Sequence, residues 1–229
     1  MKSSQIKSKS KMIFVTGTNT DVGKTYISEK IISHLLKVNK SVAVYKPIET
    51  GCRKINKKLV PLDSGNYYKL LNKKIPIDVI NPFRFIPPIS PNRAIKLAKK
   101  KIYIKNFVDK FKDFDEFEYV LVEGAGGLCS PISLDGLNID LIKKLGLDCI
   151  LVARDEIGVI NNVLLCINTL KQHKVGLKAV VLNRIVKKQP KGMDNASELT
   201  KLTKIPIIQF VNGLPSKKAI SKLIKLSFK

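Results

Sequence analysis

The amino-acid sequence predicts an α/β fold, a doubly wound and mostly parallel sheet with helices on both faces. Short apolar runs alternate with longer amphipathic segments along the chain, which is the order of strands and helices in such folds. Most of the apolar runs are continuous, as strands buried on both faces require. The 229 residues and a hydrophobic content of 44% suffice for one large core. We therefore expect a single domain over residues 12–229, preceded by a disordered polar extension over residues 1–11.

The spacing of the apolar residues places each element. The expected strands are residues 12–16, 41–46, 119–123, 149–153, 177–183 and 207–211. The expected helices are residues 25–37, 64–72, 92–101, 104–111, 138–145, 157–173, 193–203 and 216–226. The first helix shows the helical spacing through Ile27, Ile31, Ile32, Leu35 and Leu36. The prolines between residues 81 and 91 exclude regular structure there, so we expect an ordered loop or lid.

Basic residues dominate the charge of the chain. Lysine and arginine number 42 against 18 aspartates and glutamates, which gives a net charge of +24. Such a charge is typical of proteins that bind nucleic acid or anionic membranes. Here the basic residues are scattered through every segment and no nucleic-acid-binding motif occurs, so we expect no nucleic-acid partner. No apolar stretch is long enough to span a membrane. We expect a cytoplasmic protein whose positive field favours small anionic substrates.

The four cysteines have no spacing that suits a zinc site or a CxxC pair. Cys149 and Cys166 have apolar neighbours, so we expect them in the core. Cys52 and Cys129 fall in expected loops near the presumed site, where a thiol can be reactive. All four cysteines fit a reducing compartment.

A phosphate-binding loop follows the first expected strand. The segment from Thr16 to Thr25 reads TGTNTDVGKT. The backbone N–H groups of such a loop, with a helix N-terminus behind them, surround a polyphosphate. Lys24 then places its charge on the outer phosphates, and the Thr25 hydroxyl can bind Mg²⁺. The loop is one residue longer than the common motif, but the sequence still predicts a P-loop NTPase-like fold with ATP and Mg²⁺ as cofactors.

Polar or glycine-rich loops also follow the next four strands. Ligands of a doubly wound sheet bind beyond the carboxyl ends of its strands, so these loops mark the site. Glu123 ends an apolar strand, so its carboxylate is expected beside the phosphates as a Mg²⁺ ligand. Asp63 is a candidate for a second acidic ligand, or it is the N-cap of the following helix. Sequence spacing leaves both roles open.

Together these residues resemble the dethiobiotin synthetases, the ATP-dependent carboxylases and cyclases of biotin synthesis. The resemblance runs from about Met12 to Val211. It rests on the longer phosphate loop, the acid Asp63, YKPIETG at 45–51, NPFRF at 81–85 followed by Ser90-Pro91, VEGAGGLCSP at 122–131, and LNR at 182–184. The pairing of KPxxTG with VEGAGG makes this match much more specific than any single loop.

The resemblance implies that 7,8-diaminononanoate, CO₂ and MgATP give dethiobiotin, ADP and phosphate, through an N-carbamate and a carbamic-phosphoric anhydride. It implies catalytic roles for Lys46 at the carbamate and γ-phosphate, for Lys24, and for Thr50 at the diamine. It implies Mg²⁺ ligands at Thr25, Asp63 and Glu123. The implied nucleotide-binding residues are Asp21, Val22, Gly23, Lys24, Thr25, Tyr26, Asp63, Glu123, Gly124, Ala125, Gly126, Asn183 and Arg184. It also implies a homodimer, with the substrate carboxylate near the helix that follows Gly158.

Three features depart from the family pattern. Asp155 and Glu156 place two acids near the region implied for the substrate carboxylate. Residues 207–213, which would complete the adenine pocket, lack the usual sequence of that pocket. The chain then ends in a lysine-rich helix whose apolar face we expect to pack on the body of the protein.

Two other classes of protein share the phosphate loop. One is a cobyrinic-acid-type amidoligase, which also activates a carboxylate with ATP, but no glutaminase domain follows in this sequence. The other is a ParA-type DNA-partitioning ATPase, for which the charge of +24 is suitable. Such ATPases carry an extra lysine early in the loop, where this chain has Thr16, Gly17 and Thr18.

Overall fold

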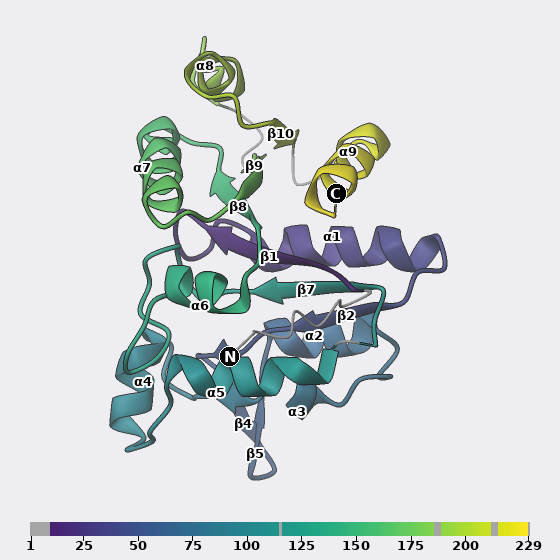
Figure 1. Cartoon of the computed structure of the whole chain (residues 1–229), viewed down its shortest axis with the longest axis vertical. Coiled ribbons are helices and arrows are strands. Elements are labelled where there is room, and N and C mark those ends of the chain that lie inside the picture. Colours follow the sequence, from purple (N-terminus) through teal and green to yellow (C-terminus); the bar gives the residue numbers. More distant parts are fainter. Residues whose placement is uncertain (1–9, 115, 186–188, 212–214, 229) are drawn as a thin grey trace, which may run out of the picture.

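A parallel sheet forms the centre of the protein in the computed structural model, which describes residues 10–114, 116–185, 189–211 and 215–228. The sheet has six strands in the order β10-β9-β8-β1-β7-β2, and every neighbouring pair is parallel. In chain order the strands are β1 (Lys11–Gly17), β2 (Val42–Tyr45), β7 (Tyr119–Glu123), β8 (Cys149–Arg154), β9 (Leu177–Asn183) and β10 (Ile207–Phe210). The predicted fold class is confirmed (Figure 1). The extension predicted over residues 1–11 lies outside the described residues except for Ser10 and Lys11, and Lys11 already belongs to β1.

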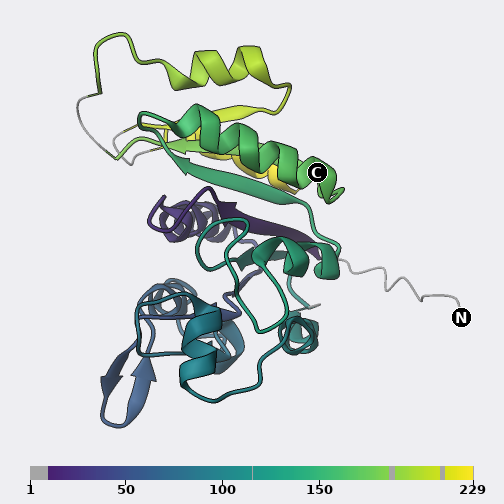
Figure 2. The same cartoon turned by 90° about the vertical axis from the view of Figure 1, so that its left-hand side faces the viewer.

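Helices cover both faces of this sheet (Figures 1 and 2). On one face, α1 (Lys24–Lys37) contacts α9 (Lys217–Ser227). On the other face lie α5 (Ile104–Phe111), α6 (Asn138–Leu145) and α7 (Val159–Gln172), while α8 (Asn195–Leu202) contacts α7 and β10. The elements β7, β9, α5 and α6 have the bounds that the sequence predicts.

Several short elements lie between β2 and β7, together with the predicted helices α2 (Asp63–Leu70) and α4 (Pro91–Leu97). β3 (Ile48–Glu49) pairs in parallel with β6 (Phe83–Arg84), and β4 (Arg53–Ile55) forms an antiparallel hairpin with β5 (Lys58–Val60). The others are α3 (Ile77–Ile80) and the 3₁₀ turn η1 (Lys112–Phe114). Sequence analysis predicts none of these short strands and turns.

The expectation that residues 81–91 contain no regular structure is wrong. β6 forms between Pro82 and Pro87, because prolines are tolerated beside a strand in a two-stranded sheet, where few backbone donors are needed. α4 begins at Pro91, since the first position of a helix needs no N–H donor and suits the fixed φ of proline.

The core lies between the sheet and its helices. The strands β7 and β8 are buried almost throughout. Tyr45 at the end of β2 packs on Phe114 with ring centres 5.2 Å apart, and its hydroxyl donates to the Phe107 carbonyl oxygen at 2.8 Å. Burial of such large aromatic side chains is worth about 2 to 3 kcal/mol each. This packing fixes the carboxyl end of β2, where the next residue is Lys46.

Candidate active site at the carboxyl ends of the strands

The predicted phosphate loop connects β1 to α1. Gly23, just before α1, has a φ of 97°, which favours glycine. A Cβ atom there would lie 2.2 Å from Nδ2 of Asn183, so the end of β9 leaves no room for a side chain at this position. The Lys24 ammonium donates to the Asn19 carbonyl oxygen at 2.9 Å across the loop. The loop is therefore held in a defined shape at the N-terminus of a long helix, which is suited to an anion.

The glycine-rich loop after β7 lies against the phosphate loop. The Gly124 N–H donates to the Val15 carbonyl at 3.1 Å, and the Leu128 N–H donates to the Gly17 carbonyl at 2.9 Å. From the start of α6, the buried amide of Asn138 donates to the carbonyl oxygens of Ala125 and Gly127, both at 2.7 Å. Asn138, which sequence analysis missed, therefore holds the shape of the second predicted nucleotide-binding loop.

Glu123 is a fully buried carboxylate that accepts four hydrogen bonds. Its Oε1 accepts from the Thr25 hydroxyl at 2.8 Å and from the Lys46 ammonium at 2.5 Å. Its Oε2 accepts from the Ser28 hydroxyl at 3.0 Å and from the Tyr67 hydroxyl. A buried charge costs little only when it is paired and hydrogen-bonded in this way. The contacts of Oε1 place Thr25 and Glu123 together, as the predicted metal site requires.

Lys46 lies between two of the predicted acidic ligands. Its ammonium is 2.7 Å from Oδ2 of Asp63 and 2.5 Å from Oε1 of Glu123. Burial alone would lower the pKa of Lys46, but the carboxylates of Glu123 and Asp63 outweigh burial and raise this pKa above its usual value. Burial alone would raise the pKa of Asp63, but the Lys46 charge outweighs it and lowers that pKa. Lys46 and Asp63 are therefore both charged at neutral pH.

The helix α2 brings Asp63 to this cluster. Asp63 is the first residue of α2 and the N-cap position is occupied by Leu62, so the N-cap alternative is wrong. The Asp63 carboxylate instead accepts from the Lys46 ammonium. Tyr67 lies one turn later on the same face. Burial, followed by the Glu123 charge, raises the pKa of Tyr67 well above its usual value. Tyr67 therefore stays protonated and donates to Glu123.

Lys24 provides a second buried cation. Burial, and next the charge of Lys46, lower the pKa of Lys24 to about 8. Two cations held this close together repel each other, and a polyphosphate between them would relieve that repulsion.

Asn183 ends β9 beside the phosphate loop, and Arg184 follows it. The Asn183 amide donates to the Val22 carbonyl oxygen at 3.0 Å, and its Oδ1 is buried without a hydrogen-bond partner. An unpaired buried acceptor is a ready site for a donor on a ligand. Arg184 instead forms an ion pair with Asp155, 3.3 Å from Nε to Oδ2.

The two acids after β8 are both neutralised by neighbours. Asp155 is buried and accepts from Arg184 and, at 2.8 Å, from the Asn195 amide. Glu156 pairs with Arg154 at 3.2 Å. Neither acid is a free negative charge, so the conflict that the sequence raises with a substrate carboxylate in this region is reduced.

Three further predicted residues are at least partly exposed. Thr50 follows β3 and is half-buried. Tyr26 in the first turn of α1 is half-buried, and the Lys30 ammonium lies 4.9 Å from the centre of its ring. Asp21 is exposed in the phosphate loop with a φ of 58°. The contacts of these three residues with ligands stay predictions. The adenine pocket also stays a prediction, because Asn212 and Gly213 lie outside the described residues.

The cysteines near the site do not form a metal centre. Burial raises the pKa of Cys52 to about 11. The prediction of a reactive thiol at this position is therefore wrong. Cys129 is exposed, whereas Cys149 is buried as predicted and Cys166 is only partly buried.

Among the residues that the structure describes, no cluster of three or more His, Cys, Asp or Glu side chains suits a metal ion. A Mg²⁺ site at Thr25, Asp63 and Glu123 has only two carboxylates, which fits a metal that takes its other ligands from phosphates and water.

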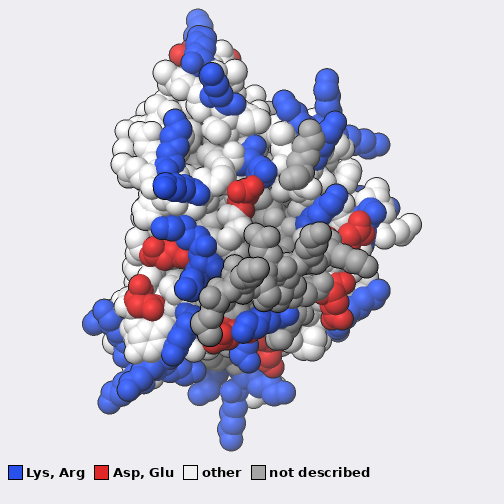
Figure 3. All heavy atoms as spheres, in the orientation of Figure 1, with Lys and Arg blue, Asp and Glu red and all other residues white. Residues whose placement is uncertain are grey.

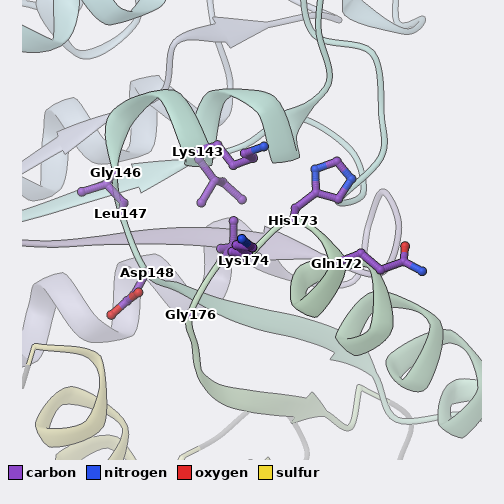
Figure 4. A pocket seen from close by; sticks show the side chains of 10 residues that line it. Lys143, Gly146, Leu147, Asp148, Gln172, His173, Lys174 and Gly176 are labelled. Atoms are coloured by element: carbon purple, nitrogen blue, oxygen red, sulfur yellow. The ribbon is translucent and has the colours of Figure 1, made fainter.

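A shallow hollow of about 490 Å³ lies at the opposite end of the sheet (Figure 4). It is lined by Lys143, Asp148, His173 and Lys174 among others, at the amino ends of β8 and β9. None of the predicted site residues lines it, and Asp148 is already paired with Lys178 at 2.9 Å. This hollow is therefore separate from the carboxyl-end site.

Basic side chains are spread over the face of the molecule that Figure 3 shows, and they do not gather into one stripe. The expectation that the charge of +24 reflects composition, with no nucleic-acid partner, stays a prediction. No helix of the described residues is long and apolar enough to cross a membrane.

Comparisons with known proteins find a matching family model and curated relatives. A family model described as an AAA domain matches residues 11–220. An ATP-dependent dethiobiotin synthetase BioD from Methanocaldococcus jannaschii is 36% identical over 179 residues, which cover 76% of this chain and 80% of that protein. The BioD protein of Vesicomyosocius okutanii subsp. Calyptogena okutanii is 37% identical over 201 residues, covering 87% and 89% of the two chains.

Solved structures share the fold. The septum site-determining protein MinD from Pyrococcus horikoshii, complexed with Mg-ADP, has a TM-score of 0.57 and 14% identity, over 95% of this chain and 94% of that one. The MinC:MinD cell division complex of Aquifex aeolicus gives a TM-score of 0.56 and 17% identity over the same shares. At such low identity these likenesses concern the fold alone.

Proposed function

The chain belongs to the ATP-dependent dethiobiotin synthetases, ligases of biotin biosynthesis, and we propose how its residues divide the work of the reaction. The substrates are 7,8-diaminononanoate, CO₂ and ATP. One amine adds to CO₂ and loses a proton, which gives a carbamate. A carbamate oxygen attacks the γ-phosphorus of ATP, and the bond to ADP breaks. The second amine then attacks the carbonyl carbon, so that phosphate leaves, a proton is released and the five-membered urea ring closes.

The phosphate loop binds the polyphosphate. Residues from Asp21 to Tyr26 surround the phosphates, and Gly124, Ala125 and Gly126 form the opposite wall. The unpaired Oδ1 of Asn183 accepts from the amino group of adenine, with Arg184 beside it. The tight approach of Asn183 to Gly23 and its buried unpaired oxygen support this arrangement.

Thr25, Asp63 and Glu123 would hold Mg²⁺, which when bound would offset the negative charge that shifts between the phosphates. The Thr25 hydroxyl contacts Oε1 of Glu123, and Lys46 contacts the carboxylates of both Glu123 and Asp63. Oxygen ligands are those that Mg²⁺ prefers.

Lys46 and Lys24 offset the negative charge of the transferred phosphoryl group. Phosphoryl transfer depends mostly on positioning and electrostatic stabilisation. Lys46 also contacts the carbamate, and Thr50, four residues later, orients the diamine. Ring closure then depends on holding the second amine against the carbonyl, which is worth about 7 kcal/mol or more in well-oriented reactions.

The protein acts as a cytoplasmic homodimer. Two exposed apolar side chains support contact with a second copy in this region: Ile157, just before α7, is 79% exposed, and Leu165, within α7, is 58% exposed. The substrate carboxylate lies near this helix and meets the partner subunit there.

One observation carries the proposal: Lys46, Glu123, Asp63 and Thr25 form a single hydrogen-bonded cluster beside the phosphate loop. The experiment is to incubate the purified protein with 7,8-diaminononanoate, bicarbonate and MgATP. Dethiobiotin is measured by mass and ADP by a coupled assay. We expect one ADP for each dethiobiotin. ADP release without dethiobiotin would contradict the proposed coupling.

A further inference from the structure

Glu49 is a buried carboxylate to which the proposed reaction assigns no role. It is the last residue of β3 and is only 5% exposed. Its backbone is held by the pairing of β3 with β6, where the Phe85 N–H donates to the Glu49 carbonyl at 2.9 Å. In sequence it lies between Lys46 and Thr50, so a rigid strand connects it to the site.

The carboxylate of Glu49 accepts three hydrogen bonds from the first turn of α2. Oε1 accepts from the Asp63 N–H at 2.9 Å. Oε2 accepts from the Ser64 N–H at 3.0 Å and from the Ser64 hydroxyl at 2.6 Å. Ser64 is fully buried, so water is not available to replace these contacts.

Glu49 therefore acts as the cap of a helix to which it does not belong. The residue before α2 is Leu62, whose side chain is exposed and makes no capping hydrogen bond. A helix N-terminus has free N–H donors and a partial positive charge, and an acidic side chain there satisfies both. Glu49 supplies that acid from another part of the chain.

This cap fixes the residue whose side chain meets Lys46. The Asp63 N–H is bound to Glu49, while the Asp63 carboxylate lies 2.7 Å from the Lys46 ammonium. One turn later in the same helix, Tyr67 donates to Glu123. The orientation of α2 at its first turn thus decides where the Asp63 carboxylate lies relative to Lys46 and Glu123.

We propose that Glu49 is a positioning residue of the reaction, which holds the first turn of α2 so that the Asp63 carboxylate faces the metal site and Lys46. The inference rests on the proposed role of Asp63 as a Mg²⁺ ligand. Glu49 itself touches neither metal nor substrate in this assignment, and it acts through Asp63.

The test measures the Mg²⁺ concentration that gives half-maximal binding of ADP, by isothermal titration calorimetry on the full chain. In Glu49→Gln, the amide group places a donor against the N–H of Asp63 or Ser64. We expect the required Mg²⁺ concentration to rise about tenfold, as for other residues that orient metal ligands. Ser64→Ala removes one of the three donors and keeps both backbone contacts. It should fold well and raise the Mg²⁺ concentration by about threefold.

The matched control is a helix cap away from the site. The Asp194 side chain accepts from the Ser197 N–H at 3.1 Å at the start of α8, so Asp194→Ala also removes a helix cap. It should leave the Mg²⁺ requirement unchanged. An equal rise in Asp194→Ala would mean that Glu49 acts only on stability, and the inference would be wrong.

A double-mutant cycle tests whether Glu49 acts through Asp63. In an Asp63→Asn background, Glu49→Gln should change the Mg²⁺ requirement by less than about twofold, because groups that act through one another are not additive. If Glu49→Gln caused the same tenfold change in both backgrounds, the inference about Glu49 would be wrong, while the proposed metal role of Asp63 would stand. If Asp63→Asn by itself left the Mg²⁺ requirement unchanged, the proposed metal role of Asp63 would fail, and the inference with it. Dethiobiotin formation by the wild-type preparation reports on the reaction independently of both.

Discussion

The Lys46 ammonium lies 2.5 Å from Oε1 of Glu123, although the two residues are far apart in sequence. The pairing of β2 with β7 brings them together, since Tyr45 and Val122 are direct partners in that ladder and each precedes one member of the pair. A cation and a carboxylate thus end neighbouring parallel strands, at the edge of the sheet where ligands of this fold bind.

Replacing Lys46 with methionine should remove turnover and weaken the fold. The substitution keeps the length of the side chain but leaves the buried Glu123 carboxylate without its cation. We expect dethiobiotin formation to fall by about 10³-fold, because one group that stabilises transition-state charge is lost. The free energy of unfolding in urea, measured without Mg²⁺, should fall by about 3 kcal/mol, since a buried ion pair loses one partner. Wild-type turnover in this variant would remove Lys46 from the mechanism.

Glu123→Gln should raise the Mg²⁺ requirement more than Ser28→Ala does. The amide is neutral, so it is a weaker metal ligand and a weaker partner for Lys46 and Thr25. Ser28 contacts only Oε2, the other oxygen of Glu123. The Mg²⁺ dependence of dethiobiotin formation should therefore shift by about tenfold or more in Glu123→Gln and change little in Ser28→Ala. Equal shifts would show that the packing around Glu123 matters and its charge does not.

The sequence predicts the central sheet well because each of its strands is a short, apolar run with polar or glycine residues at its end. It does not predict β3 and β6, since strands of two residues show no periodicity. The hairpin of β4 and β5 is exposed and basic, so it lacks the apolar alternation of a strand. Its turn did carry a signal: Asn56 and Lys57 have φ values of 48° and 63°, and asparagine favours such hairpin turns.

The sequence predicts those site residues whose type is required by the chemistry. It does not predict residues that join the site through the packing of the fold. Thr25, Lys46 and Glu123 follow strands or the phosphate loop, and the structure brings them together as expected. Tyr67 is missed because an aromatic residue in a helix usually belongs to the core. Its position four residues after Asp63 is the signal that both side chains share a face. Glu49 is missed because its partners are backbone N–H groups of a helix distant in sequence.

Asp155→Ala should lower stability without changing the metal site. The buried Asp155 carboxylate accepts from Arg184 and Asn195, and the Gln189 amide donates to its carbonyl oxygen at 2.9 Å. Loss of the carboxylate leaves two donors partly buried and unpaired, which costs about 2 kcal/mol. Urea unfolding should show this loss, while the Mg²⁺ requirement for ADP binding should equal that of the wild type. A changed Mg²⁺ requirement would mean that this network extends to the metal site.

Alkylation should distinguish the cysteines by exposure and by pKa. Burial raises the pKa of Cys52 to about 11, so its thiol stays protonated and unreactive from pH 7 to 9. Cys149 is buried, whereas Cys129 is exposed. Iodoacetamide, followed by peptide mass spectrometry, should therefore label Cys129 first and leave Cys52 and Cys149 unlabelled in the folded protein. Labelling in urea is the control for reagent access. Rapid labelling of Cys52 in the folded protein would contradict its burial.

The proposed homodimer predicts a specific effect of charge on α7. Leu165 lies on α7 and Ile157 lies just before that helix, and both side chains are exposed. An aspartate at position 165 would place a charge in the centre of the interface, where burying it without a partner is costly. We expect the wild type to sediment at twice the mass of one chain, and Leu165→Asp to sediment as a monomer with an unchanged circular dichroism spectrum. Leu202→Asp, on the exposed side of α8, is the matched control and should remain a dimer. If Leu165→Asp is also a dimer, the interface lies on another face, and the substrate carboxylate must then be bound by residues of a single subunit.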